Sequence, residues 1–532
     1  MTRFVQTGPS LPDPYTNDRM LRSWLDRLLG PAGHAAAAPT LTALAQEVLG
    51  PLREAHHDAE AHPPTLTRYD AWGARIDRVD TAPGWEAQRR AAARYGLVGA
   101  ADRVRQHALL HLYGPESATF TCPVAMADGA AALLGRPDVD PAVRDAWLPR
   151  LVSTDPATAI TSGQWMTESQ GGSDISRTGT VAVRDGNQWR LTGEKWFCSA
   201  VDSAVAVALA RPVGADPGSR TLVPFLVPRY ADDGRPAPGI TLHRLKDKLG
   251  TRAVPTAEVG LDGAAAIPLG DPTEPGLHRM MTLVVVTRLH NAAAAAGGMR
   301  RGLSYALSYA GERNVATGRL RDNPLHRATL GALAVDAAGA YALTAHAFAL
   351  LGAASEAELR LVAPLAKLVT GKLAVSSASE YLECFGGAGY VEDTGLPRLL
   401  RDAQVLPIWE GTTNVLAVDV LRAFGGAKLI LDRVNEAVGT ATGTAAETLV
   451  AARDRLAAEI ATIDPRADRA LAGARGLALR LGYALAAALL YEHAAWSGDD
   501  ADTLVAALWT QRWLGGADIA TAVAEQFDQL AA

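Results

Sequence analysis

Residues 166–176 read MTESQGGSDIS, and residues 177–197 continue as RTGTVAVRDGNQWRLTGEKWF. The first stretch has neither the Gly-Lys-Ser/Thr of a Walker phosphate loop nor the Gly-x-Gly-x-x-Gly of a dinucleotide fingerprint. In the second stretch, Val181 and Val183 alternate with other residues ahead of Asp185-Gly186, a pattern that predicts a β-hairpin. The loop therefore leads into a sheet, and taken alone it is a polar turn that Ser173 caps.

The pattern of apolar residues along the chain differs before and around this hairpin. Before it, Leu21, Leu25 and Leu28 recur at helical spacing, and the stretch PAGHAAAAPT that follows them predicts a break. Around the hairpin, short β-rich stretches such as AVAVALA and TLVPFLVP are separated by glycine, proline and aspartate. The order is therefore helical first and β-rich second.

Helical periodicity returns after Met280 and continues to the C-terminus. Leu365, Leu368 and Leu373 lie on one apolar stripe, and Lys367 is expected off it. These patterns predict an α+β fold in four segments: an N-terminal helical domain (1–156), a middle β domain (157–277), a helical bundle domain (278–425) and a C-terminal helical extension (426–532).

The amino-acid composition limits the classes of protein to which this chain can belong. The 532 residues are 48% hydrophobic and 20% charged, which indicates a large soluble protein with several domains. A net charge of -6 provides no overall basic field for nucleic acid or anionic lipid. Three widely separated cysteines without CxxC spacing predict neither a disulfide framework nor zinc, so no metal is expected: Cys122, Cys198 and Cys384.

The sequence also predicts where the protein is found. The N-terminal residues lack an apolar core after a basic start, so we expect no secretory signal and a cytoplasmic protein. The most apolar runs are interrupted by charged or polar residues, and no membrane span is expected: the interruptions are Arg288, His290, Arg480 and Glu492.

Several motifs together resemble one family. The helical, β, helical order, the MTExxxGSD loop and IWEGTTNVL at 408–416 resemble the acyl-CoA dehydrogenase family. Three further segments resemble its AidB branch, which is associated with the bacterial adaptive response to DNA alkylation: PRYADDGRPAPGITLHRLKDKLGTRAVPTAEV, GEKWFCS and ECFGGAGYVEDTGLPRLLRD. The long helical extension after Arg422 also fits that branch. The resemblance implies a three-domain acyl-CoA dehydrogenase-like fold, although fold alone does not fix function.

The resemblance implies FAD as the cofactor and assigns the opening loop to it. Met166 and Thr167 would contact the isoalloxazine edge, and Ser173, beside Gly172, would bind the pyrophosphate. The strand that would cover the flavin contributes Trp196, Phe197, Cys198 and Ser199. Two alternatives stay open, because Trp196 also suits a core position and Cys198 reads as a small buried apolar residue.

Glu410 carries the chemistry that the resemblance implies. A glutamate at this place removes the α-proton of an acyl-CoA thioester while the β-hydrogen leaves as hydride to the flavin. Ile408 and Trp409 make its approach apolar, and Gly411 allows a tight turn; the alternative is a glutamate in a solvent-exposed turn. The next helix would open with residues whose backbone N–H groups and side chains bind FAD: Thr412, Thr413 and Asn414.

The resemblance also implies a site shared between subunits. Arg313 matches a position that holds the FAD pyrophosphate from the neighbouring subunit, and Gly386 and Gly387 fit a Gly-Gly-x-Gly turn at the same interface. We therefore expect a homotetramer built as a dimer of dimers. The sequence departs from the family pattern at Ala316 and Thr317, where an aromatic residue and glycine are expected, and a solvated side chain is the alternative for Arg313.

The resemblance to the AidB branch also implies DNA binding, and the charge of the residues after Gly426 bears on that property. After Gly426 there are nine basic and fourteen acidic residues, a net charge of -5. We expect Arg453, Arg466 and their basic neighbours to lie in a salt-bridged solvent face, with at most weak binding of double-stranded DNA.

The sequence therefore predicts an FAD-dependent, acyl-CoA dehydrogenase-like oxidoreductase of AidB type that acts on a CH–CH group of acyl-CoA or a related molecule. A link to the protection of DNA from alkylation comes with that branch. The alternatives are a DNA-associated flavoprotein with structural FAD and little dehydrogenase activity, and an oxygen-using flavin enzyme of the same fold. Glu410 counts against the oxygen-using enzyme.

Overall fold

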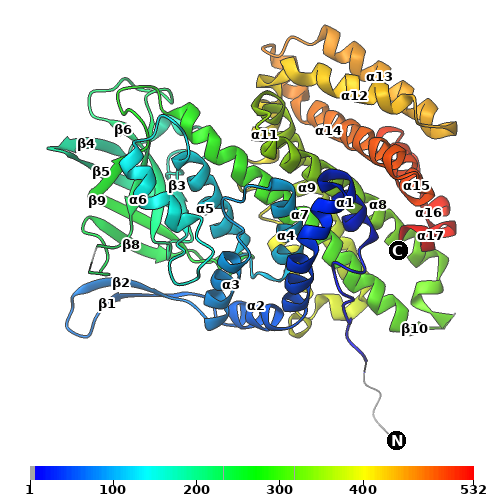
Figure 1. Ribbon diagram of the computed structural model, residues 1–532, viewed down its shortest axis with the longest axis horizontal. Helices are drawn as coiled ribbons and strands as arrows, with labels where there is room; N and C mark the ends of the chain where they lie inside the picture. The colour runs from blue at the N-terminus through cyan, green and yellow to red at the C-terminus, as the bar shows by residue number, and fades with distance from the viewer. Residues whose placement is uncertain (1–5, 232, 317, 532) are drawn as a thin grey trace, which may run out of the picture. The chain divides into compact units, whose positions relative to one another are not determined.

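The computed structural model describes residues 6–531 except 232 and 317. The chain divides into two compact units (Figure 1). The helical unit comprises Met1–Leu49, Asp102–Pro115 and Asn291–Ala532, and the β unit comprises Gly50–Ala101 and Glu116–His290. The predicted α+β class is confirmed, because a block of strands lies between two largely helical parts of the chain.

The β unit is built on one seven-stranded sheet. Its pairings β6–β4, β4–β5, β5–β9, β9–β7 and β7–β6 close into a ring, while β3 pairs with β6 and β8 with β9. The strands are β3 (Ser162–Trp165), β4 (Val181–Asp185), β5 (Gln188–Ser199), β6 (Val205–Pro212), β7 (Val223–Pro228), β8 (Ile240–Leu245) and β9 (Thr256–Pro268).

The hairpin predicted from Val181 and Val183 is β4–β5. The two strands are antiparallel, with Asp185 opposite Gln188, so the loop is Gly186-Asn187. Gly186 has a φ of +60°, a left-handed conformation that glycine adopts without steric cost. The hairpin prediction is therefore confirmed.

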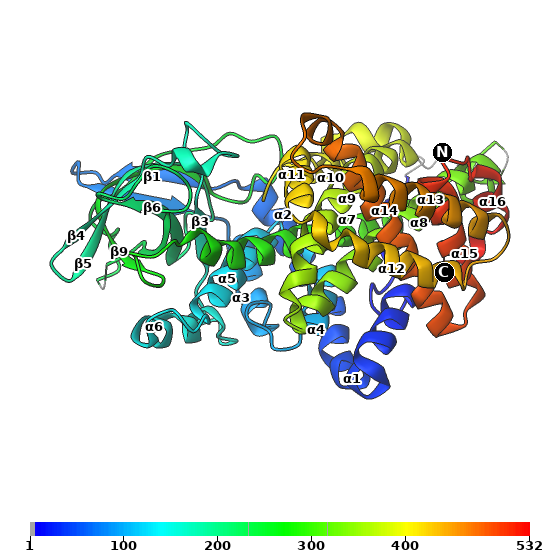
Figure 2. The same cartoon turned by 90° about the horizontal axis from the view of Figure 1, so that it is seen from above.

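Helices cover one face of the sheet. Leu133 of α5 (Thr121–Leu134) and Leu283 in the first part of α7 (Leu277–Glu312) pack in one core with Val207 and Leu226 of the sheet. In Figures 1 and 2, α5 and α6 (Pro141–Leu151) lie side by side against this face. A second core on the other side of the strands contains Trp165 and other buried side chains.

The remainder of the β unit comes from the region expected to be helical. It contains α2 (Pro51–Ala61) and α3 (Pro83–Arg94), but also an antiparallel pair, β1 (Thr65–Tyr69) and β2 (Arg75–Asp80), that was not predicted from the sequence. The N-terminal segment 1–156 thus contributes to both units, with residues up to Leu49 and from Asp102 to Pro115 packing in the helical unit.

The helical unit consists almost wholly of helices. The break predicted at PAGHAAAAPT (31–40) occurs directly before that stretch, because α1 turns at Gly30, whose φ is +70°, while residues 31–40 themselves are helical. In Figure 1, α12, α13 and α14 lie side by side. The helices are α1 (Arg19–Leu49), α4 (Arg103–Tyr113), the rest of α7 (Leu277–Glu312), α8 (Pro324–Gly352), α9 (Glu356–Cys384), α10 (Pro397–Ala403), α11 (Thr413–Arg422), α12 (Ala427–Val438), α13 (Gly443–Thr462), α14 (Asp468–Ser497), α15 (Asp500–Trp509), α16 (Ala520–Glu525) and α17 (Phe527–Leu530).

Helix α9 corrects one expectation. Leu365, Leu368 and Leu373 are buried as predicted, but Lys367 is 0% exposed rather than turned to solvent. Long neighbouring helices surround α9, so a position off its apolar stripe is still inside the unit. A buried lysine needs an acceptor, and this one has a role in the candidate site.

Among the residues that the structure describes, three helices are long and apolar enough to cross a membrane by length and composition, namely α8, α9 and α14. In the most apolar window of each, 83%, 83% and 67% of the residues are buried inside the protein. Burial in the helical unit therefore accounts for their hydropathy.

Candidate active site

The loop that begins at Met166 is organised by Glu168. This carboxylate is 3% exposed and accepts hydrogen bonds from the backbone N–H of Gly179 at 2.6 Å and from the hydroxyl of Thr180 at 2.5 Å. Lys195 of β5 donates to it from Nζ at 2.7 Å. These bonds tie both ends of the loop to the sheet.

The Glu168–Lys195 pair is inside the β unit. Lys195 is 1% exposed and also donates to the carbonyl oxygen of Leu209 at 2.7 Å. Burial works to raise the pKa of Glu168, but attraction to Lys195 and the hydrogen bonds outweigh it and lower the pKa. Burial lowers the pKa of Lys195, and the carboxylate opposes that shift. The pair was not predicted, although both residues are in the quoted motifs.

The residues assigned to flavin in the β unit lie around this pair. Thr167 is half-buried, and its carbonyl oxygen accepts from the N–H of Trp196 at 2.9 Å, so the structure brings the loop and the strand together. Met166 and Trp196 are half-buried as well, and Phe197 is 57% exposed. The hydroxyl oxygen of Ser199 lies 3.1 Å from the hydroxyl oxygen of Thr256.

Two residues behave differently from the rest. Cys198 is buried in the sheet core, and burial raises the pKa of its thiol, which confirms the interpretation as a small apolar residue. Ser173 is exposed beside the exposed Gly172, and it does not cap the turn. Asp174 does so instead, by accepting from the N–H of Ser176 at 3.1 Å, because its carboxylate reaches back over the short helical turn that follows.

Lys246 adds a positive charge to the exposed aromatic pair. Its Nζ lies 3.4 Å from the ring centroid of Trp196 and 5.1 Å from that of Phe197. The same Nζ donates to Glu258 at 2.5 Å. The cation therefore sits on an aromatic face with a fixed carboxylate partner. No sequence signal pointed to Lys246.

The helical unit contains the predicted Glu410 turn. Glu410 has a φ of +56° and Gly411 a φ of +104°, so two successive residues are left-handed. Lys367 of α9 donates to the carbonyl oxygen of Gly411 at 2.5 Å. The tight turn is confirmed, and the buried lysine that holds it was missed.

The approach to this turn is tightly packed and partly apolar. A Cβ added at Gly371 of α9 would lie 3.2 Å from the carbonyl oxygen of Leu406, so the helix and the turn meet at their backbones. Ile408 is 58% exposed, while Trp409 and Glu410 are half-buried.

The helix after the turn begins as predicted. Thr412 is the N-cap of α11, and its hydroxyl accepts from the N–H of Val415 at 3.5 Å. Thr413 is buried and Asn414 is exposed in the first turn. The first N–H groups of a helix have no partner within it, so they can bind the oxygen atoms of a ligand.

Arg313 lies at the end of α7, before the strand pair β10 (Asn314–Val315) and β11 (Gly318–Arg319). Tyr309, one turn earlier, packs against Phe385 with ring centroids 4.9 Å apart, which brings the end of α7 to the predicted glycine turn. Arg313 is half-buried and Ala316 is exposed. Thr317 lies outside the described residues.

The glycine turn itself is a short helical segment, Gly386–Tyr390. Gly386 has a φ of +57°, and Gly386 and Gly387 are exposed. A Cβ added at Gly389 would lie 2.0 Å from the carbonyl oxygen of Leu382, so only glycine fits there.

The arginines of the C-terminal extension are only partly paired. Arg453 pairs with Asp454 and Arg480 with Glu459, as a salt-bridged face requires. The expectation was wrong for three others, whose exposed side chains have no ion-pair partner in the part of the chain that the structure describes: Arg466, Arg469 and Arg475. Asp464, two residues before Arg466, accepts from the backbone N–H of Arg466 and not from its guanidinium, which a charge count does not reveal.

The chain matches three domain families along its length. Residues 10–156 match the N-terminal domain of adaptive response protein AidB, residues 163–264 the middle domain of acyl-CoA dehydrogenases, and residues 274–425 their C-terminal domain.

Two curated relatives are similar over most of the chain. Acyl-CoA dehydrogenase family member 11 from Caenorhabditis elegans is 40% identical over 92% of this chain and 86% of its own length. Putative acyl-CoA dehydrogenase AidB from Escherichia coli is 34% identical over 71% of this chain and 72% of its own.

Two solved structures share the fold. Caenorhabditis elegans ACDH-11 in complex with C11-CoA has a TM-score of 0.91 at 37% identity and covers 97% of this chain and 93% of its own. An acyl-CoA dehydrogenase complexed with FAD from Bacillus anthracis has a TM-score of 0.68 at 15% identity and covers 97% and 89%.

Proposed function

Because the chain belongs to the acyl-CoA dehydrogenase family, and within it to the AidB-like branch, we propose that it is an FAD-dependent oxidoreductase that dehydrogenates a CH–CH group of an acyl-CoA thioester. The proposed base is Glu410. The relative solved with C11-CoA supports an acyl-CoA substrate for this chain, since the two match over nearly their whole lengths.

The observation that carries the proposal is the conformation of Glu410. A left-handed backbone costs a residue with a Cβ about 1–2 kcal/mol, and such outliers persist where surrounding structure holds them. Here Lys367 holds the next carbonyl from a buried helix. A glutamate kept in this strained position fits a group that must meet a substrate carbon in a fixed geometry.

The exposed apolar side chains and the N–H groups at the start of α11 are suited to binding FAD. Ile408 in the helical unit and Phe197 in the β unit are large apolar side chains exposed to water, and contact with a bound ring system would stabilise either of them. The first turn of α11, after Thr412, offers N–H groups to polar ligand atoms. When bound, the flavin supplies the hydride acceptor. Glu410 would take and hold the α-proton.

The proposal is tested with the purified holoprotein. An anaerobic screen of acyl-CoA thioesters should bleach the flavin absorbance with at least one chain length, because removal of two hydrogens reduces the cofactor. A yellow protein that no thioester bleaches would favour the alternative with a structural flavin, and colourless protein that cannot be reconstituted with FAD would reject the cofactor assignment.

We also propose a homotetramer, in which Arg313 and the turn at Gly386 serve a cofactor shared with a neighbouring subunit. Exposed apolar side chains beside that turn support an interface, because Tyr390 is 90% and Val391 48% exposed. The proposed location is the cytoplasm, which is compatible with three free cysteines.

A second function, weak association with double-stranded DNA and a role in protection from alkylation, is favoured by one observation. Arg466, Arg469 and Arg475 are exposed and unpaired among the residues that the structure describes. Three phosphate contacts would give a slope of about -2.7 in log K against log salt, so binding should be weak at physiological salt.

Fluorescence anisotropy of a labelled duplex at several salt concentrations tests this, with the triple change to Glu and with Arg453→Glu as the control. Binding that the triple change leaves intact would reject the role of these arginines.

A further inference from the structure

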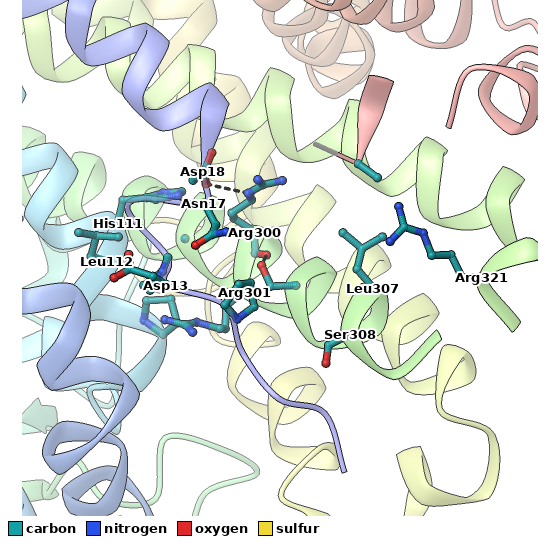
Figure 3. A pocket seen from close by; sticks show the side chains of 16 residues that line it. Asp13, Asn17, Asp18, His111, Leu112, Arg300, Arg301, Leu307, Ser308 and Arg321 are labelled. Atoms are coloured by element: carbon teal, nitrogen blue, oxygen red, sulfur yellow. Dashed lines mark hydrogen bonds and ion pairs between the residues drawn. The ribbon is translucent and has the colours of Figure 1, made fainter. Parts of the chain in front are cut away.

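A pocket of about 370 Å³ lies within the helical unit (Figure 3). Residues 12–18 form one wall, the end of α4 a second and the latter part of α7 a third, with Arg321 at one side. Its volume is at the lower end of the roughly 300–1,000 Å³ of small-molecule sites. It contains none of the residues assigned to FAD or to the acyl-CoA chemistry.

The two carboxylates that line this pocket already accept hydrogen bonds from other groups of the protein. Asp13 accepts at one oxygen from the N–H groups of Tyr15 and Thr16 and at the other from Gln46 at 2.7 Å. Asp18 is 3% exposed and accepts from the N–H of Leu21 at 3.0 Å and from Nε of Arg300 at 2.7 Å. Every carboxylate oxygen that lines the pocket therefore has a donor.

The donors are in excess. Arg300 gives only its Nε to Asp18, and its two terminal nitrogens have no acceptor among the described residues. Figure 3 shows Arg300 directed toward Asp18 and the guanidinium of Arg321 directed toward Leu307. Arg321 pairs with Asp528 across an exposed 3.4 Å contact and lies over the ring of Phe527. A surplus of donors calls for a ligand rich in acceptors.

The buried imidazole of His111 provides a further polar atom to the pocket. It is 5% exposed, and its Nδ1 has no hydrogen-bond partner within the described part of the chain. Burial lowers the pKa of His111 to about 4, so the ring is neutral at physiological pH. The lining also includes apolar residues, namely Leu112, Leu307 and prolines.

We propose that this pocket binds a small organic anion, with its carboxylate or phosphate at the terminal nitrogens of Arg300 and a short aliphatic part against the apolar part of the lining. Arg321 attracts the anion without being its main contact. The site is separate from the dehydrogenation chemistry and does not require that chemistry to be correct.

The test is isothermal titration calorimetry of the FAD-loaded protein with inorganic phosphate, glycerol 3-phosphate and butyrate, and with ethylammonium as a cation control. At least one anion should bind saturably, at one site per subunit, and ethylammonium should not. Phosphate binding without butyrate binding identifies a phosphate site, and the reverse a carboxylate site.

Two variants locate the site. Asp18→Asn combined with Arg300→Met removes the ion pair as a unit, and should weaken binding about tenfold or more through the lost charge-assisted bonds. Arg321→Ala should weaken it less. Arg327→Ala is the matched control, because Arg327 pairs with the same Asp528 and lies over the same Phe527 ring but does not line the pocket.

FAD content and unfolding temperature serve as fold controls. If the double variant does not fold, the comparison of anion binding between Arg321→Ala and Arg327→Ala is sufficient to test the proposal. Absence of saturable binding by all three anions, or equal binding by Arg321→Ala and Arg327→Ala, overturns the proposal.

Discussion

Lys367 in the buried helix α9 donates to the carbonyl oxygen of Gly411 at 2.5 Å, directly after Glu410. The bond joins the interior of the helical unit to a turn with two successive left-handed residues. Lys367 therefore acts on the chemistry through the backbone, as a positioning residue for the proposed base.

Lys367→Met should retain FAD but slow acyl-CoA-dependent flavin reduction by about 10- to 100-fold, because a carbonyl left without its donor lets the turn relax and a small misplacement is costly. The effect should fall on kcat with KM nearly unchanged, measured by steady-state kinetics. Lys372→Met, on the same helix but half-buried, is the control. A lower unfolding temperature with an unchanged reduction rate would assign Lys367 a purely structural role.

Glu168→Ala should destabilise the protein strongly, by about 3–5 kcal/mol, because it leaves Lys195 charged and unpaired inside the β unit. Glu168→Gln combined with Lys195→Met removes both charges and should cost less. Unfolding temperature and FAD content measure both effects, since the loop at Met166 depends on this carboxylate.

Arg244→Ala, which breaks a more exposed contact with Glu258, is the control and should cost less than about 1 kcal/mol. If the single and double changes at Glu168 and Lys195 are equally mild, the pair does not organise the loop.

Arg313→Ala should release FAD while the helical content measured by circular dichroism stays the same, because the change removes a contact to phosphate and no apolar packing. Arg319→Ala, on the exposed strand pair that follows, is the control. Light scattering of the unmodified protein should give a tetramer. Full FAD occupancy in a monomer would refute the shared cofactor.

Asp336 should make stability depend on pH. Burial raises its pKa to about 6, although Arg512 and Trp513 donate to it. The unfolded carboxyl titrates near 3.8. Between these values the folded state alone holds the proton, so the stability that Asp336 contributes falls as pH rises from about 4 to 6, by up to about 3 kcal/mol.

The variant Asp336→Asn lacks this titration. The unfolding temperature of the variant minus that of the unmodified protein should rise between about pH 4 and 6 and then level off, in scanning fluorimetry at constant ionic strength. A difference that stays flat or falls would mean that Arg512 keeps the carboxylate ionised in the folded state.

Local patterns in the sequence were sufficient for several features. The β4–β5 hairpin, the break next to PAGHAAAAPT, the tight turn at Glu410 and the start of a helix after it each depend on residues adjacent in the chain, so propensity and turn chemistry predict them. The resemblance supplied the cofactor and the substrate class, which no local pattern contains.

The missed features depend on partners far along the chain. Lys367 and Gly411 are 44 residues apart, and Glu168 and Lys195 are 27 apart. Amphipathic periodicity identifies the apolar face of α9, but it does not reveal that other helices also cover the opposite face. The strand pair β1–β2 was missed because Arg75 and Asp77 give it a polar texture, although Asp77 is buried and accepts from the N–H of Leu242.

The most direct test of Glu410 as the base is anaerobic single-turnover reduction of the bound flavin in Glu410→Gln, followed by its absorbance with the acyl-CoA that bleaches the unmodified protein. The amide is nearly isosteric and cannot take a proton, so FAD should stay bound while reduction slows by about 10²–10⁴-fold or more. Glu383→Gln, exposed at the end of α9, should reduce at the unmodified rate. Reduction by Glu410→Gln at the unmodified rate would contradict the assignment of Glu410 as the base.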